Sequence, residues 1–336
     1  MPQLSPAPIT ESPIEPMEAR LVDALPDDAG WQFEPKWDGF RCVAVKRDGA
    51  VALFAKSGKP LGRYFPDVVE LLRSLPADDF ILDGELTIPV DGRLSFDELQ
   101  LRLHPAASRV RKLAAAHPAE YVLFDLPLGP GGELLEHQPL SVRRPALERF
   151  FGAVERQGLR LSPATIDRQQ AEKWLAGAGG GDVDGVVAKR VAAPYVEGER
   201  DMLKVKRVRT ADCVVGGFRY GTGSRLVGSL LLGLYDDEGR LNHVGFTSAL
   251  PAAGKPELTA RLEGFRGGPG FTGREPGGPS RWSTERTGEY EKLRHELVVE
   301  VGFDHVTGER IRHGARFVRW RPDKRPDQCR MEQLGR

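Results

Sequence analysis

The chain has 336 residues, of which 40% are hydrophobic and 29% are charged, and its formal net charge at pH 7 is zero. This composition is typical of a globular protein with ordinary cores, and the length predicts two domains. No apolar stretch approaches the roughly 18 residues of a membrane-spanning helix, and the proline-rich start lacks the features of a secretory signal, so we expect no membrane partner.

The cysteines predict a reducing compartment. Cys42, Cys213 and Cys329 are odd in number, lie far apart and do not have the spacing of zinc ligands. Because disulfides are rare in the cytosol, we expect free thiols and a cytoplasmic protein.

The neutral total hides an uneven distribution of charge. Residues 1–206 contain 26 basic and 31 acidic residues, whereas residues 207–336 contain 22 basic and 17 acidic ones. Much of the positive excess lies close to the C-terminus, at Arg310, Arg312, Arg316, Arg319, Arg321, Lys324, Arg325 and Arg330. A basic module of this kind indicates contact with the phosphate backbone of a nucleic acid, although charged runs are also common on solvated faces.

The first part of the chain mixes strands and helices without regular alternation. A proline-rich tail at residues 1–15 is expected to be disordered. Helices are predicted at 66–75, 95–103 and 141–152, and strands at 40–47, 50–54, 80–88, 121–126, 184–189 and 202–206. This mixture favours an α+β fold over a doubly wound sheet.

After Arg207 the pattern changes to short β segments with glycine-rich turns. Strands are predicted at 212–220, 229–235, 243–248 and 296–303, with one helix at 256–265. Such a set is typical of a small barrel such as an OB-fold. Residues 207–210 would act as a hinge, and the glycine- and proline-rich segment 267–279 is expected to be a mobile loop.

The most informative run is Glu34 to Arg41, which has the form K-x-D-G-x-R. We expect it in one tight turn, where Lys36 could attack a phosphate because nearby positive charge depresses the pKa of its amine. Gly39 would let the backbone approach a ligand closely, and Arg41 could grip a phosphate or a sugar. A charged entry to a hairpin is the alternative interpretation of this run alone.

Further motifs follow in order: Asp83-Gly84-Glu85, Phe124-Asp125, Asp184-Gly185-Val186-Val187-Ala188-Lys189, Lys204-Val205-Lys206 and Arg321-Pro322-Asp323-Lys324. In this order and spacing, the chain resembles the covalent nucleotidyltransferase superfamily. Within it, the sequence is most similar to the ATP-dependent DNA ligases, and it looks like the small two-domain bacterial type called ligase C. The resemblance covers about Pro16 to Lys324.

The resemblance implies a fold and a division into domains. A nucleotidyltransferase (ATP-grasp-like adenylation) domain is expected at residues 16–207, and an all-β OB-fold barrel at residues 211–330. Both agree with the change of pattern near Arg207.

The resemblance also implies that Lys36 is the catalytic residue, which attacks the α-phosphate of ATP and holds AMP as a phosphoramidate. Lys204 and Lys206 share one face of a strand, so both could bind phosphates and lower the pKa of Lys36. Alternate lysines that merely face solvent would show the same spacing.

Other residues are implied to bind the nucleotide. Arg41 would contact the ribose or, later, the 5′-phosphate of the DNA, and Lys189 would contact the nucleotide or support the metal site. Phe124 would stack on the adenine, although its apolar surroundings alone are more typical of a core phenylalanine. Glu85 would contact the ribose and a metal ion, and Asp184 would also bind the metal, which is expected to be Mg²⁺ with Mn²⁺ as the alternative.

The last motif and two departures from the family pattern complete the site. Arg321, Asp323 and Lys324 would bind the nucleotide and orient pyrophosphate during the first step. Asp184 stands where most members have glutamate, which shortens its reach to a metal. Lys56 stands where members commonly have arginine, so it keeps the charge but not the bidentate geometry.

The implied function is the sealing of nicked double-stranded DNA by a bacterial monomer that acts in repair, with a repair polymerase as an expected partner. An RNA ligase or a capping-type nucleotidyltransferase would share the lysine motif, and the labelling nucleotide and the accepted nick separate these alternatives. A non-catalytic nucleic-acid-binding module would shift DNA on a gel without turnover.

Overall fold

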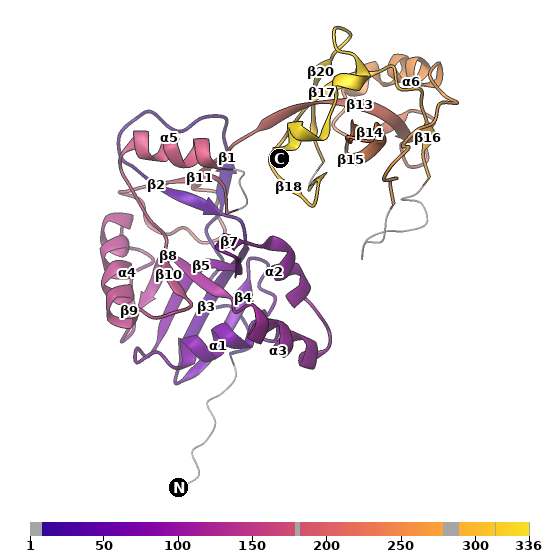
Figure 1. Cartoon of the computed structure of the whole chain (residues 1–336). Coiled ribbons are helices and arrows are strands. Elements are labelled where there is room, and N and C mark those ends of the chain that lie inside the picture. Colours follow the sequence, from indigo (N-terminus) through magenta and orange to yellow (C-terminus); the bar gives the residue numbers. More distant parts are fainter. Residues whose placement is uncertain (1–8, 179–181, 278–288, 313, 336) are drawn as a thin grey trace. The chain divides into compact units, whose positions relative to one another are not determined.

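The computed structural model describes residues 9–178, 182–277, 289–312 and 314–335 (Figure 1). The chain divides into two compact units, Met1–Arg207 and Val208–Arg336, and each is described by itself. Within the described ranges, no helix is both long and apolar enough to cross a membrane. Helices and sheets are mixed, as the predicted α+β class requires.

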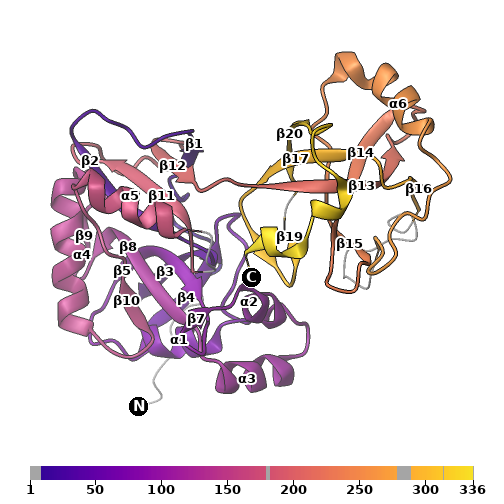
Figure 2. The ribbon, with the colours of Figure 1, turned by 45° about the horizontal axis from the view of Figure 1, so that its top comes forward.

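A four-stranded sheet of the first unit can be followed in Figure 2, and one of its strands carries Lys36. Its strands lie in the order β1 (Ala19–Leu21), β12 (Met202–Lys206), β11 (Val183–Arg190) and β2 (Trp31–Trp37). Because side chains alternate between the two faces, Phe33, Val186 and Val205 share one face. They form a small core with Ala171 of α5 (Arg168–Gly177), which leaves the other face to the charged residues of β2, β11 and β12.

Pro35 lies inside β2 without weakening the sheet. β2 is an edge strand, and backbone N–H groups point alternately to the two sides of a strand. Phe33 exchanges backbone hydrogen bonds with Thr165, on the side away from β11. The nitrogen of Pro35 points to that same side, so its missing N–H removes no bond between β2 and β11.

The prediction for the segment around Lys36 is wrong in one detail. Lys36 lies on strand β2, and the turn comes after it, before β3 (Phe40–Arg47). Gly39 lines the cavity described below and also approaches the protein itself, because a Cβ atom built there would lie 2.3 Å from the backbone oxygen of Leu86 in β5 (Phe80–Thr87). The glycine is therefore needed for packing of the turn against β5.

A second, six-stranded sheet forms the centre of the first unit. Its order is β10 (Leu159–Leu161), β8 (Glu120–Gly129), β5, β3 and β4 (Ala50–Ala55), with β9 (Glu133–Leu134) paired to β8. One face packs with α1 (Pro66–Arg73) and α4 (Leu140–Val154) through a large core, and the unit also contains α2 (Phe96–Arg102), α3 (Ala107–Ala116) and the pair β6 (Pro89–Val90) and β7 (Arg93–Leu94). The other face carries Val43, Val45 and Ile81, which pack with Tyr195 and Met202.

The elements predicted for this unit are confirmed. The hairpin of β3 and β4, the helices α1, α2 and α4, and the strands β5, β8, β11 and β12 all lie where their patterns indicate. Ser95 caps α2 by accepting a hydrogen bond from the backbone nitrogen of Glu98 at 3.3 Å. The helices α3 and α5 were not predicted; Asp167 caps α5, and its position before the helix was an available signal.

The tail at residues 1–15 was predicted to be disordered, and the structure contradicts this for its described part, residues 9–15. Residues 1–8 lie outside the described residues. Further along, Ile14 is only 5% exposed and packs in the same core as Val43. The backbone nitrogen of Glu15 donates to Glu197 Oε2 at 2.8 Å. The described end of the tail is therefore anchored, because Ile14 supplies apolar contact that the proline-rich composition obscured.

The second unit is built on one antiparallel six-stranded sheet. Its order is β15 (Leu241–Thr247), β14 (Val227–Tyr235), β13 (Arg209–Tyr220), β17 (Val298–Phe303) and β20 (Arg316–Trp320), with β16 (Glu291–Lys292) paired to β13. It also contains α6 (Lys255–Glu263), the hairpin of β18 (Val306–Thr307) and β19 (Arg310–Ile311), and the 3₁₀ helices Ala252–Gly254, Pro326–Gln328 and Met331–Leu334. The predicted strands and helix of this unit are confirmed.

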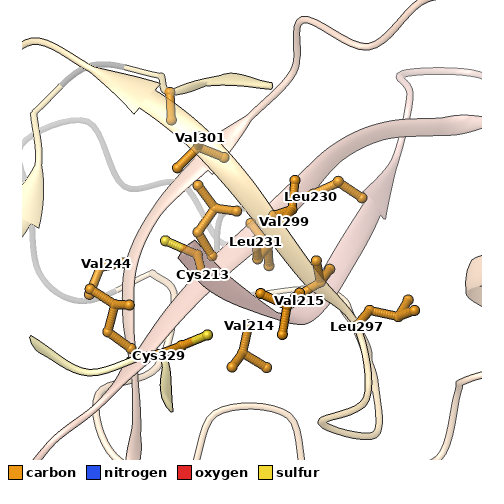
Figure 3. Close-up of a cluster of buried hydrophobic side chains, with 14 of the residues drawn as sticks. Cys213, Val214, Val215, Leu230, Leu231, Val244, Leu297, Val299, Val301 and Cys329 are labelled. Atoms are coloured by element: carbon orange, nitrogen blue, oxygen red, sulfur yellow. The ribbon is translucent and has the colours of Figure 1, made fainter. Parts of the chain in front are cut away.

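The core of the second unit is dominated by β-branched and leucine side chains of β13, β14 and β17. Figure 3 shows Val215, Leu231 and Val299 there, together with the free thiols of Cys213 and Cys329. Burial raises the pKa of Cys213 well above its usual range, so this thiol is an inert core side chain.

The segment 267–279 is anchored as far as it is described, contrary to the predicted mobile loop. Phe271 is buried in the core of the second unit, and the backbone nitrogen of Thr272 donates to the oxygen of Leu241 at 3.1 Å. Residues 278 and 279 lie outside the described residues. The buried ring of Phe271 and these backbone hydrogen bonds together fix the described part.

Candidate active site

A cavity of about 790 Å³ lies in the first unit, with walls from both of its sheets. Several of the predicted site residues line it: Lys36, Arg41, Glu85, Phe124, Lys189 and Lys204. Asp184 and Lys206 lie next to Lys36. The remaining predicted residues, Arg321, Asp323 and Lys324, belong to the second unit.

The register of three strands places Lys36. Gly185 of β11 pairs with Lys36 on one side and with Lys206 on the other, so these residues form a row across one face of the sheet. A Cβ atom at Gly185 would lie 2.0 Å from the backbone oxygen of Val205. Glycine is thus required for the close approach of β11 and β12 that sets the two lysines on either side.

The carboxylate of Asp184 forms ion pairs with both lysines of this row, Lys36 and Lys206. Lys36 Nζ donates to Asp184 Oδ2 at 2.9 Å, and Lys206 Nζ lies 3.7 Å from the same oxygen. Asp184 can reach this face because the pairing with β2 is irregular between Val183 and Gly185. A bulge of this kind redirects a side chain that would otherwise face the other side.

Lys204 faces the cavity from the neighbouring position on β12. Burial lowers its pKa, and repulsion from Lys36, Lys206 and Lys56 lowers it further. Lys56 forms an ion pair with Glu18 at 2.8 Å, at the edge of the same cavity. A cavity with this excess of lysine is suited to a polyanion such as a triphosphate.

Arg41 is held by a bidentate ion pair. Its Nε donates to Asp83 Oδ1 at 2.9 Å, and its Nη2 donates to Asp83 Oδ2 at 2.5 Å. The side chain of Asp83 is fully buried and does not line the cavity. The side chain of Glu85 does line it. The two acids of the motif therefore act differently, since Asp83 orients Arg41 and Glu85 faces the cavity.

Glu85 is the carboxyl group most affected by the cavity. Burial raises its pKa to about 8, although Lys36 and Arg41 act in the opposite direction. At neutral pH this carboxyl is therefore largely protonated, and further positive charge in the cavity would ionise it. Carboxylate oxygens are the ligands that Mg²⁺ prefers, so Glu85 and Asp184 suit such an ion chemically.

The ring of Phe124 forms part of the cavity wall and is half-buried. The Arg41 guanidinium lies 5.2 Å from the ring centroid, and Lys189 Nζ lies 5.0 Å from it. The two interpretations of this residue are thus compatible, because the ring packs partly in the protein and partly faces the cavity.

A buried network of charges lies behind Phe124. Lys189 Nζ donates to the backbone oxygen of Phe124 at 3.0 Å and pairs with Glu34 Oε1 at 3.0 Å. Asp125 accepts a hydrogen bond from Arg143 Nε at 2.8 Å and lies 3.8 Å from Lys189. Burial acts to raise the pKa of Asp125, but Lys189 and Arg143 together lower it. The network fixes the backbone that carries Phe124.

Some residues around the cavity were missed at the sequence level. Glu34 lies two residues before Lys36, and the alternation of strand β2 would have placed it on the same face. Glu18, Arg143 and Tyr195 belong to no motif, and only the folded chain brings them to the site.

The motif of the second unit forms an ion cluster around Asp212 of β13. Arg321 Nη1 lies 2.8 Å from Asp212 Oδ1, and Lys324 Nζ lies 3.3 Å from Asp212 Oδ2. Arg321 also pairs with Asp323 at 2.8 Å and lowers the pKa of this carboxyl to about 2. The cluster keeps the three predicted residues together just after strand β20.

Comparisons with known proteins agree on one family. Residues 16–206 match the family model for the ATP dependent DNA ligase domain, and residues 223–324 match that for the ATP dependent DNA ligase C terminal region. DNA ligase C1 of Mycolicibacterium smegmatis is 41% identical, and DNA ligase C of Mycobacterium tuberculosis is 40% identical; each match covers 96% of this chain and 94% of the relative. A solved structure from a study of Lig E DNA ligases has the same fold, with a TM-score of 0.56 at 16% identity, and covers 91% of this chain and 99% of that one.

The chain therefore belongs to the ATP-dependent DNA ligases, which confirms the resemblance seen in its motifs. The fold class is confirmed with it, as an α+β nucleotidyltransferase domain followed by an OB-fold domain. The nucleotide of the enzyme is ATP.

Proposed function

We propose that this ligase seals 3′-OH/5′-phosphate nicks in double-stranded DNA through an adenylate on Lys36. The observation that supports this most is the place of Lys36 in the wall of a lysine-rich cavity that Arg41 and Phe124 also line. An amine, a set of cations and an aromatic ring around one cavity suit a nucleophile, a triphosphate and a base.

In the first step, the neutral Nζ of Lys36 attacks the α-phosphorus of ATP. A P–N bond forms, the bond from that phosphorus to the bridging oxygen breaks, and pyrophosphate leaves. In the second step, the 5′-phosphate of the nick takes AMP from Lys36. In the third, the 3′-OH attacks this phosphate and AMP leaves, so one difficult condensation becomes three easier transfers.

The other cavity residues bind and orient the nucleotide. Phe124 stacks on the adenine, and Lys189 holds the backbone of Phe124 in place through its hydrogen bond to the Phe124 oxygen. Arg41 contacts the ribose or the 5′-phosphate. Lys204 and Lys206 bind the phosphates through their ammonium groups, which are strong donors to phosphate oxygens. A fixed geometry of this kind lowers the barrier by removing the need to bring the groups together.

Glu85 and Asp184 are the residues that would hold Mg²⁺, or Mn²⁺ in its place. The ion neutralises phosphate charge when it is bound. In the second unit, Arg321, Asp323 and Lys324 orient pyrophosphate, and the other basic residues close to the C-terminus contact the DNA backbone. We further propose that the enzyme is a monomer and acts in repair beside a polymerase, which the resemblance to ligase C proteins supports.

Sealing of defined nicks tests the proposal. A labelled duplex with one 3′-OH/5′-phosphate nick is incubated with the full chain, ATP and Mg²⁺, beside duplexes whose nicked strand is RNA. We expect sealing of the DNA nick and dependence on ATP. Sealing of RNA alone would favour the RNA-ligase alternative, and a gel shift without sealing would favour the non-catalytic binding module.

A further inference from the structure

A buried tyrosine lies behind the ion pair of Arg41 and Asp83. Tyr195 belongs to the segment between β11 and β12, and it is 4% exposed. Its Oη donates to Asp83 Oδ2 at 2.7 Å and accepts a hydrogen bond from the backbone nitrogen of Met17 at 3.0 Å. Burial raises the pKa of Tyr195 well above its usual range, so the hydroxyl keeps its proton and remains a donor.

These bonds form one continuous line of contacts into the cavity. Met17 orients the Tyr195 hydroxyl, the hydroxyl holds Asp83, and Asp83 holds Arg41 by two hydrogen bonds. At the far end, the Arg41 guanidinium lies over the ring of Phe124, in the cavity wall. The hydroxyl and Arg41 Nη2 share Asp83 Oδ2, so the carboxylate cannot rotate without breaking one of these contacts.

We propose that Tyr195 is a positioning residue of the ligation reaction, whose hydroxyl fixes Asp83 and thereby the Arg41 guanidinium at the cavity. This inference rests on the role proposed for Arg41 in the function above. A partner that orients a contacting residue commonly affects turnover more than its own distance from the substrate suggests, because small errors in placement are costly.

The chain offers a matched control for the loss of the hydroxyl. Tyr195→Phe keeps the ring, which packs with Val43 and lies 5.8 Å from the Arg143 guanidinium. Tyr121→Phe removes a hydroxyl that is just as deeply buried but donates to the backbone oxygen of Cys42 at 2.8 Å. A purely structural role of Tyr195 would therefore make the two variants behave alike.

The experiment measures both variants in the full chain. Thermal unfolding gives their stability, and single-turnover assays give the rates of adenylation and of nick sealing at a temperature where every protein is folded. We expect similar losses of stability, but a rate about tenfold lower only for Tyr195→Phe, the size expected of one hydrogen bond to an ionised group. Combined with Arg41→Lys, Tyr195→Phe should add little, since both changes disturb the same guanidinium.

Two results would overturn the inference. One is a wild-type rate for Tyr195→Phe; the other is an undiminished effect of this change in the Arg41→Lys background. If Tyr195→Phe does not fold, 3-fluorotyrosine at residue 195 changes the donor strength of the hydroxyl at nearly constant shape, and an unchanged rate would again contradict the proposal. Failure of the wild-type chain to become adenylated or to seal DNA would instead contradict the proposed function.

Discussion

At the scale of single residues, the buried charges behind Phe124 depend on one another. The side chain of Asp125 is 2% exposed and lies between those of Arg143 and Lys189, which are 1% and 4% exposed. Removal of one member of a buried ion pair leaves the others unpaired away from water, and this is more costly than the pair itself is worth. The network is therefore a sensitive point for stability as well as for the placement of Phe124.

We expect Asp125→Ala to lower the free energy of unfolding by about 3–5 kcal/mol, because it removes the carboxylate partner of buried Arg143 and leaves Lys189 with Glu34 alone. Glu172→Ala is the matched control, since Glu172 pairs with Arg168 on the surface of α5 at 2.9 Å. Its effect should stay within about 0.5 kcal/mol. Urea unfolding of the two variants measures the difference, and equal effects would show that the network contributes nothing special.

The buried histidine His243 should make the stability of the second unit depend on pH. Burial lowers its pKa to about 3, and Arg310, Arg219 and Arg274 act in the same direction. Arg310 Nη2 donates to its Nδ1 at 3.0 Å, and Nε2 has no hydrogen-bond partner within the described part of the chain. The neutral ring is therefore the form that fits the folded protein.

An unfolded histidine titrates near pH 6.5, so between about pH 6.5 and 3 the unfolded chain binds more protons at this position. The free energy of unfolding should fall in that window as the pH falls, by up to about 1.4 kcal/mol per pH unit. His243→Gln should flatten this slope, whereas His137→Gln, at an exposed position, should not. Unfolding curves at several pH values check this, and parallel slopes for all three proteins would contradict it.

At the scale of elements, the spacing between β11 and β12 depends on Gly185. We expect Gly185→Ala to destabilise the protein by about 1–3 kcal/mol and to slow adenylation, because the new methyl group would meet the backbone of Val205. Gly152→Ala in α4 is the control, since a Cβ atom built there would meet no described heavy atom within 4 Å beyond its chain neighbours and the backbone of its own helix. It should be neutral or stabilising by up to about 1 kcal/mol. Thermal unfolding and adenylation rates together test the contrast.

Most elements were predictable because their periodicity is local. Alternating or continuous apolar runs indicated β3, β5, β8 and the strands of the second unit, and Ser95 marked the start of α2. β2 was missed because Pro35 and the charges around it are typical of a turn. What makes this a strand is the pairing with β11, which is distant in sequence and leaves no local signal.

The candidate site was predictable in its membership but not in its geometry. The motifs identified Lys36, Arg41 and Glu85, and all of them line one cavity. The burial of Asp83 and the bulge that redirects Asp184 depend on register between strands, which the motifs do not encode. The roles assigned to these residues in catalysis stay predictions.

At the scale of the whole molecule, residues of both units take part in the proposed reaction. Lys324 should matter for transfer of AMP from ATP more than for sealing a nick that already carries AMP. We expect Lys324→Ala to slow adenylation by roughly 10- to 100-fold, as for other residues that stabilise a developing phosphate charge. Arg325→Ala is the control, because Arg325 is an exposed neighbour paired with Asp327. If Lys324→Ala and Arg325→Ala had equal effects on adenylation and on the sealing of a nick that already carries AMP, the role proposed for Lys324 in adenylation would be contradicted.

Covalent labelling of the protein by ATP tests most directly whether Lys36 carries AMP. The full chain is first freed of bound AMP with pyrophosphate, then mixed with Mg²⁺ and α-labelled ATP or GTP and denatured on a gel. Lys36→Ala is run beside it, with Lys59→Ala as an exposed lysine control. We predict label from ATP alone, released by pyrophosphate, absent from Lys36→Ala and retained in Lys59→Ala. Absence of label in the wild-type chain, or label that persists in Lys36→Ala, would contradict the account.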